Sequence, residues 1–142
     1  MSRARSKARN CAVQALYEWQ MSGNKVQDIY EQFLVERNTS KFDTAYFRDL
    51  LLGVTDHVAQ IDQQLQPHLD RPIDEVDPVE RAVLRMGAYE LIHKLEVPYR
   101  VAINEAVEAA KLFGADQGHK YVNGVLDKVA QQVREAEVAQ PR

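Results

Sequence analysis

The sequence predicts an all-α protein made of two small helical bundles packed across each other. Along nearly all of the 142 residues, apolar side chains recur at spacings of three and four, which is the period of a helix with one buried face. No segment alternates apolar and polar residues as a half-buried strand does. Hydrophobic residues make up 45% of the chain, so it has enough apolar surface for a packed core.

The first half of the chain is expected to form three helices. Apolar stripes cover residues 8–19 and 26–35, and Gly23 lies in the turn that separates them. Asp43 is a good N-cap for a long third helix, whose stripe runs over residues 47–65. These helices make up the first predicted bundle, over roughly residues 1–66.

The second half is expected to form three more helices after a linking segment. Asp77 precedes Pro78, which fits the first helical position, and Glu80 follows three residues after the cap. This pattern is that of a capping box, so a helix is predicted to begin there. The next helix ends near Gly114, and the last one begins near Gln117.

These elements are interpreted as one domain over residues 1–134, with subdomains at roughly 1–66 and 71–134. Residues 135–142 are polar and are expected to form a flexible tail. Asn123 and Gly124 lie within helical spacing and not between alternating strands. We therefore interpret Gly124 as a point of close packing inside the last helix, where glycine costs about 1 kcal/mol.

Several classes of protein are not favoured by this composition. No apolar run approaches the ~18 residues of a membrane span, and the N-terminus has no apolar signal-peptide core. Cys11 is the only cysteine, which fits a reducing cytoplasm. The four histidines have no metal-ligand spacing, and there is no Gly-rich phosphate loop or nucleophile motif. We expect no catalytic residues, metal or cofactor, and hence no enzyme.

The charge is divided between one end of the chain and the rest. Four cations lie within the first nine residues, and the first acidic residue is Glu18. Without these four, 21 acidic residues outnumber 14 basic ones. A cationic end suits a nucleic acid, and an anionic body suits a basic protein. The cations are Arg3, Arg5, Lys7 and Arg9.

Six segments in order resemble the NusB family of bacterial transcription antitermination factors. They read RNCAVQALY (9–17), YFRDLL (46–51), VERAVLR (79–85), VPYRVAINEA (97–106), AKLFG (110–114) and HKYVNGVLD (119–127). The resemblance covers residues 1–134, and its specificity lies in the combination of segments.

This resemblance implies a function in transcription. Members of the family pair with NusE, a small-subunit ribosomal protein, on single-stranded boxA RNA of ribosomal RNA operons, and they help RNA polymerase to pass terminators. Two alternatives stay open at this point. The chain could be the RNA-recognition domain of a ribosomal-RNA cytosine methyltransferase, or a homodimeric structural protein.

The resemblance also implies two sets of site residues. The cationic end would contact RNA phosphates, and planar or basic side chains near the end of the long third helix and the start of the last helix would contact bases and phosphates. The full RNA set is Arg3, Arg5, Lys7, Arg9, His68, Arg71, Gln117, Lys120 and Tyr121. Relatives can carry tyrosine at the position of His68, so the resemblance supports stacking at His68 less strongly than at Tyr121. The NusE set is Tyr17, Asp74 and Glu80.

Overall fold

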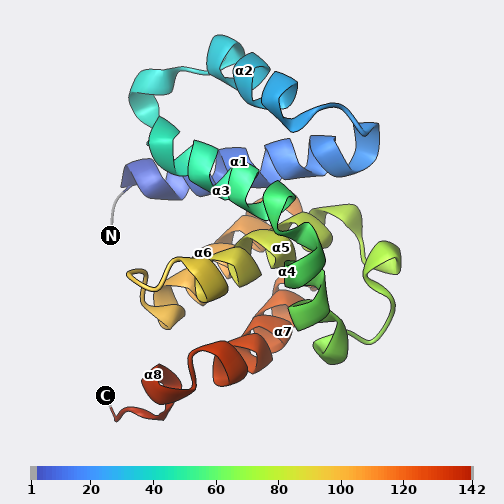
Figure 1. Ribbon diagram of the computed structural model, residues 1–142, viewed down its shortest axis with the longest axis vertical. Helices are drawn as coiled ribbons and strands as arrows, with labels where there is room; N and C mark the ends of the chain where they lie inside the picture. The colour runs from blue at the N-terminus through green and yellow to red at the C-terminus, as the bar shows by residue number, and fades with distance from the viewer. Residues whose placement is uncertain (1–2, 142) are drawn as a thin grey trace.

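The computed structural model describes residues 3–141, and every regular element within them is helical, as predicted (Figure 1). Three short 3-10 turns lie among the α-helices, at Thr39–Lys41 (η1), Gln66–His68 (η2) and Ile73–Glu75 (η3). The α-helices are α1 (Arg3–Ser22), α2 (Val26–Glu36), α3 (Thr44–Asp56), α4 (Val58–Leu65), α5 (Pro78–His93), α6 (Tyr99–Phe113), α7 (Gly118–Val133) and α8 (Glu135–Ala139).

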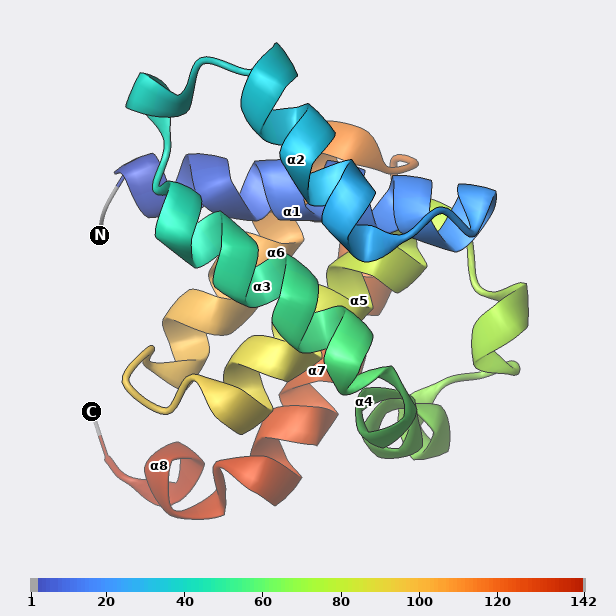
Figure 2. The same ribbon diagram turned by 45° about the horizontal axis from the view of Figure 1, so that its top comes forward.

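The helices form two groups that cross each other. α1, α2 and α3 pack together, and α5, α6 and α7 form the second group. Figure 2 shows α1 and α3 lying across the second group. α5 contacts α1, α3, α4, α6 and α7, so that ten consecutive residues, Ala82–Leu91, are buried. α5 is therefore the centre of the fold.

The two predicted N-caps are confirmed. Asp43 Oδ1 accepts a hydrogen bond of 3.0 Å from the Tyr46 amide at the start of α3. Asp77 Oδ2 accepts one of 3.2 Å from the Glu80 amide at the start of α5. Each bond satisfies an amide that has no partner inside its own helix.

The long third helix of the sequence prediction is two helices. The chain leaves helical geometry at His57, with φ −116° and ψ 20°, and the His57 ring Nδ1 lies 2.9 Å from the Gly53 carbonyl oxygen. The break lets α3 pack on α1 while α4 packs on α5 and α7. An uninterrupted apolar stripe could not reveal this change of direction.

The C-terminal segment contains a short helix that the sequence analysis does not predict. Residues 135–139 form α8, and a Glu137 carboxylate oxygen accepts a 2.8 Å bond from the Tyr99 amide at the start of α6. Arg134 is buried and donates to the carbonyl oxygens of Leu91 (2.8 Å) and Lys94 (3.0 Å), which closes the end of α5. Residues 135–139 of the expected tail thus form a short helix, and residue 142 lies outside the described residues. No helix within residues 3–141 is long and apolar enough to cross a lipid bilayer.

Candidate nucleic-acid interface

The cationic N-terminal segment is the first part of α1. Arg3 and Lys7 are exposed on it, and the Arg5 side chain is 38% exposed. The Arg5 guanidinium lies 4.1 Å from the centre of the Tyr46 ring, and the Asp43 amide donates a 3.1 Å bond to the Ala4 carbonyl oxygen. The segment is therefore held against the start of α3. Its charges add to the positive end of the helix dipole, which favours a bound anion.

Arg9 does not belong to this exposed set, and the structure corrects the prediction. Its side chain is 3% exposed, and its Nε and Nη2 donate to the two carboxylate oxygens of Glu90 at 3.0 and 2.9 Å. Its Nη1 donates to Glu105 at 2.8 Å, and the Tyr46 hydroxyl also donates to Glu90. Burial opposes the charge of Arg9, but its hydrogen bonds and its attraction to Glu90 raise its pKa. Arg9 joins α1 to α5 and α6.

The periodicity of α1 contains the signal that identifies Arg9 as buried. Ala12 and Val13 lie three and four residues after it, and both are buried. Arg9 therefore shares their face of the helix. A prediction from charge alone places Arg9 with the exposed cations, because it takes no account of this face.

A second site lies between η2 and α7, where a hollow of about 440 Å³ is open to the surface. Six of its lining residues are not in the predicted RNA set, namely Pro67, Leu69, Asp70, Gly124, Val125 and Lys128. Three predicted RNA residues line it, namely His68, Lys120 and Tyr121. The structure thus brings together residues from positions 67–70 and 120–128.

Arg71 lies at the edge of this hollow through its contact with Asp70. The Arg71 Nε and Nη2 donate to the Asp70 carboxylate at 2.8 and 2.9 Å, and the Tyr121 hydroxyl donates to the same carboxylate at 2.9 Å. The Arg71 guanidinium lies 5.7 Å from the centre of the Tyr121 ring. His68 Nε2 lies 3.1 Å from Gln132 Oε1, which orients the His68 ring from α7.

Gly124 does not pack closely inside the protein, contrary to the prediction. A Cβ built at this position meets nothing within 4 Å, and the residue is exposed on the lining of the hollow. Gly124, Val125 and Lys128 follow Tyr121 at three, four and seven residues, so they share one face of α7. This spacing could have identified Lys128 from the sequence.

Gln117, another predicted RNA residue, does not line the hollow. It is exposed at the N-cap of α7, one turn before Tyr121. Figures 1 and 2 also show that the N-terminus and the segment between α4 and α5 lie on opposite sides of the molecule. An RNA that contacts both the N-terminal cations and the hollow has to cross the surface between them.

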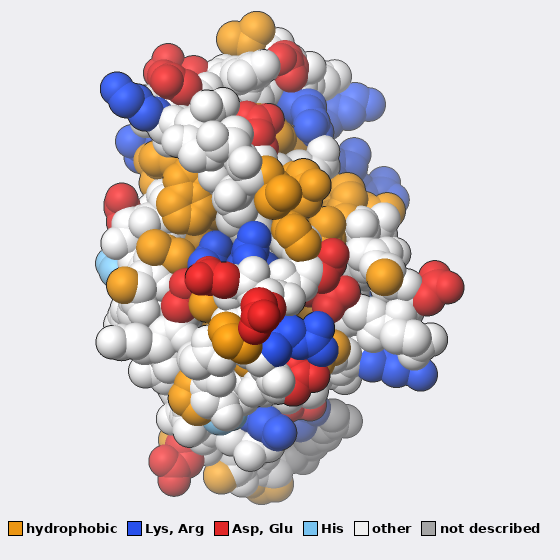
Figure 3. Space-filling model, turned by 90° about the vertical axis from the view of Figure 1, so that its right-hand side faces the viewer, with side chains coloured by type: hydrophobic (Ala, Val, Ile, Leu, Met, Phe, Trp, Pro, Cys, Tyr) orange, Lys and Arg blue, Asp and Glu red, His pale blue; other side chains and the backbone are white. Residues whose placement is uncertain are grey.

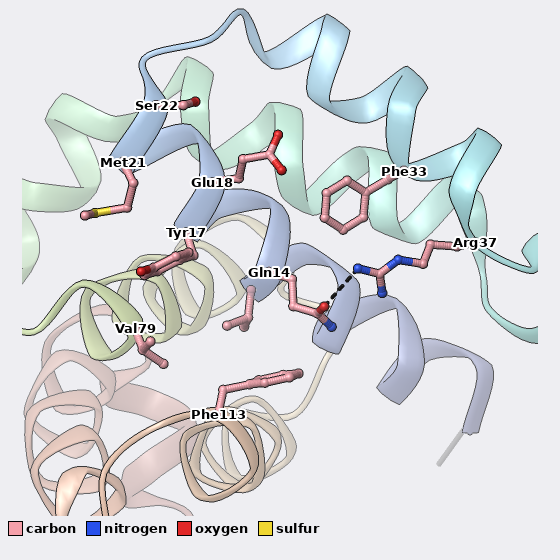
Figure 4. Close-up of a pocket in the computed structure, with 10 residues that line it drawn as sticks. Gln14, Tyr17, Glu18, Met21, Ser22, Phe33, Arg37, Val79 and Phe113 are labelled. Atoms are coloured by element: carbon pink, nitrogen blue, oxygen red, sulfur yellow. Dashed lines mark hydrogen bonds between the residues drawn. The ribbon is translucent and has the colours of Figure 1, made fainter.

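Tyr17, the first of the predicted partner residues, lies toward the other end of α1. Tyr17 is 39% exposed and lines an apolar hollow of about 520 Å³ with Met21, Val79 and Phe113. Figure 4 shows these residues around the hollow, together with the 2.9 Å bond from Arg37 to Gln14. Figure 3 shows apolar side chains gathered in a band across the upper half of this side of the molecule, with acidic and basic side chains both above and below the band.

Glu80 lies next to Val79 of this hollow at the start of α5, and Asp74 lies in the preceding turn, η3. Glu80 follows Val79 and packs so closely on Gly118 that a Cβ there would lie 2.5 Å from Glu80 Oε2. Burial, and then the charge of Asp77, raise the pKa of Glu80. Asp74 is exposed, and its carbonyl oxygen accepts a 3.0 Å bond from Arg81. Among residues 3–141, no group of three or more His, Cys, Asp or Glu side chains is arranged to hold a metal ion.

Comparisons with known proteins give a consistent result. The chain matches the model of the NusB family over residues 6–131. The transcription antitermination protein NusB of Shewanella loihica is 57% identical over 125 residues, which cover 88% of this chain and 93% of that protein. The NusB protein of Idiomarina loihiensis is 57% identical over 131 residues, which cover 92% of this chain and 94% of that protein.

Solved structures share the same fold. T. maritima NusB has a TM-score of 0.85 and 25% identity, with 99% of this chain and 100% of that chain covered. A crystal structure of the antitermination factors NusB and NusE in complex with dsRNA contains a chain with a TM-score of 0.83 and 28% identity. That match covers 93% of this chain and 99% of the other.

Proposed function

The chain belongs to the NusB family of transcription antitermination proteins, and we propose that it pairs with NusE on boxA RNA of ribosomal RNA operons. In that role it helps RNA polymerase to pass terminators in the cytoplasm. The observation that carries the RNA proposal is the hollow between η2 and α7, which combines an aromatic ring, an imidazole and two lysines.

The chemistry of this hollow suits an unstacked base. Single-stranded RNA is recognised by stacking its bases on planar side chains and by pairing its phosphates with cations. Tyr121 and His68 supply planar groups, and Lys120 and Lys128 supply cations. Gly124 leaves the helix surface between them without a side chain, so a base or sugar can approach the backbone.

The exposed cations of α1 suit a second stretch of the same RNA. Arg3 and Lys7 project from the first two turns of α1, so RNA does not have to order the backbone that carries them when it binds. Such contacts position the RNA without reading its sequence. Arg9 has no part in them, because its charge is already neutralised inside the protein.

The apolar hollow at Tyr17 suits the protein partner. An interface of this kind has an apolar centre with aromatic anchors and a charged rim. Tyr17, Met21 and Phe113 provide the centre, while Glu80 and Asp74 provide negative charge for a basic ribosomal protein.

A salt titration tests the RNA proposal. We expect the Arg3→Ala, Lys7→Ala double variant to bind single-stranded boxA RNA more weakly and to lower the slope of log K against log salt by about 1.4, at ~0.7 per phosphate contact. The matched control is Arg100→Ala with Lys25→Ala, which removes one exposed arginine and one exposed lysine elsewhere. An equal slope for the two double variants would contradict the assignment. Titration with a double-stranded RNA of the same sequence determines whether the protein prefers single-stranded or double-stranded RNA.

Binding of NusE tests the partner surface. Tyr17→Ala is expected to weaken NusE binding at least tenfold, as for an aromatic anchor at an interface centre, which is about 1.4 kcal/mol or more. Leu95→Ala, at another exposed apolar residue, is the control. If calorimetry gives the same affinity for both variants, NusE does not use this hollow.

A further inference from the structure

Asp70 accepts hydrogen bonds from Arg71 and Tyr121, both of which are predicted RNA residues. Its carboxylate accepts both hydrogen bonds of the Arg71 fork and a third from the Tyr121 hydroxyl. The Asp70 amide in turn donates a 3.3 Å bond to the Tyr121 hydroxyl oxygen. The cluster is open to solvent, since the side chains of Arg71 and Asp70 are 50% and 57% exposed.

This arrangement matches the way in which arginine binds phosphate. The guanidinium fork binds a carboxylate and a phosphate through the same two parallel N–H bonds. A phosphate that approaches Arg71 therefore meets a group that already occupies the fork. The Asp70 carboxylate also lines the hollow that contains Lys120 and Lys128, so its negative charge opposes theirs.

We propose that Asp70 is an internal competitor for RNA, which occupies Arg71 and Tyr121 in the free protein and must be displaced when a phosphate binds there. The proposal rests on the proposed function, because it takes RNA as the ligand of the hollow. The Arg71–Asp70 ion pair is exposed to solvent, and such pairs contribute little to stability, so a phosphate can replace Asp70 at a small cost in free energy.

Arg71 and Tyr121 would be released when RNA displaces Asp70, and not by protonation of Asp70. The hydrogen bonds from Arg71, and then the one from Tyr121, lower the pKa of Asp70 to about 2. Asp70 is therefore charged at every pH at which the folded protein would be assayed. The competition lowers the affinity of every RNA that binds through Arg71 by the same factor, so an RNA that offers only a phosphate is released while one that also fills the hollow can stay bound.

Removal of the charge at position 70 tests the proposal. We expect Asp70→Asn and Asp70→Ala to bind a fluorescent single-stranded boxA oligonucleotide about two- to fivefold more tightly than the parent, the range that an exposed ion pair allows. Asp127→Asn is the matched control, because Asp127 is an exposed aspartate on α7, the helix that carries Tyr121. It is expected to bind like the parent. In an Arg71→Ala background, Asp70→Asn is expected to give a smaller gain, because the residue for which Asp70 competes is gone.

The outcomes separate this proposal from the one on which it rests. If the parent does not bind the oligonucleotide, the proposed function fails. If the parent binds it and Asp70→Asn binds equally or more weakly, Asp70 does not compete with RNA. An equal gain from Asp127→Asn, or an undiminished gain without Arg71, would show a general charge effect and would also overturn the proposal.

Discussion

Two clusters in this protein have nearly the same bonds but lie in opposite environments. In one, the Arg9 Nε and Nη2 both donate to the Glu90 carboxylate, and the Tyr46 hydroxyl donates to the same carboxylate. In the other, Arg71 donates two bonds to Asp70, and Tyr121 donates a third.

Burial separates their roles. The side chains of Arg9 and Glu90 are 3% and 0% exposed, whereas those of Arg71 and Asp70 are 50% and 57% exposed. Inside the core, removal of one charged partner leaves the other buried, with neither water nor a counter-charge, and this strongly destabilises the fold. At the surface, water and ions replace a lost partner, so the same bonds can be exchanged for a ligand. Bonding geometry alone does not distinguish a structural cluster from a binding one.

The largest expected difference is in stability after loss of the arginine. Arg9→Ala is expected to lower the free energy of unfolding by about 3–5 kcal/mol, because Glu90 would be left charged and buried. Arg71→Ala is expected to change it by less than about 0.5 kcal/mol. Urea denaturation of both variants measures the contrast. Equal losses would mean that burial does not separate the two clusters.

A smaller contrast is expected from the two tyrosines. Tyr46→Phe removes the hydroxyl that donates to buried Glu90, and a bond to a charged group is worth about 1.5–3 kcal/mol. Tyr121→Phe removes a bond to exposed Asp70, where water can take its place, so we expect a change below about 0.5 kcal/mol. Thermal melting compares the two, and a larger effect from Tyr121→Phe would contradict the comparison.

The smallest expected effect concerns a third polar cluster of intermediate burial. The His57 and His93 rings are 4.5 Å apart between centres, and burial of His93, and then the charge of His57, lower the pKa of His93, while Asp49 opposes the shift. The unfolded chain therefore binds this proton more readily than the folded protein, and stability is expected to fall as the pH drops below the usual histidine range.

Melting temperatures between pH 7.5 and 5 measure this effect. His93→Gln is expected to reduce the loss of stability toward pH 5, and His119→Gln serves as the control. An unchanged pH profile in His93→Gln would assign the loss to other groups.

The sequence predicts some residues of the candidate site and misses others. His68, Lys120 and Tyr121 do line one hollow, and Arg71 lies at its edge. Gln117 lies outside it, and Lys128 and Asp70 were not selected. Spacing along α7 contains the signal for Lys128. The role of Asp70 depends on Tyr121, which is 51 residues away, and no local pattern predicts that contact.

The sequence by itself determined the all-α class, the N-caps at Asp43 and Asp77, and the family. Helical periods and caps act within three or four residues, so a short segment contains all the information they need. Only the tertiary structure decided that the predicted third helix turns at His57 and that Arg9 is buried. The partners of Arg9 on α5 and α6 lie 81 and 96 residues away. Burial is a property of such distant contacts, and burial determines whether a charged residue supports the fold or remains available to a ligand.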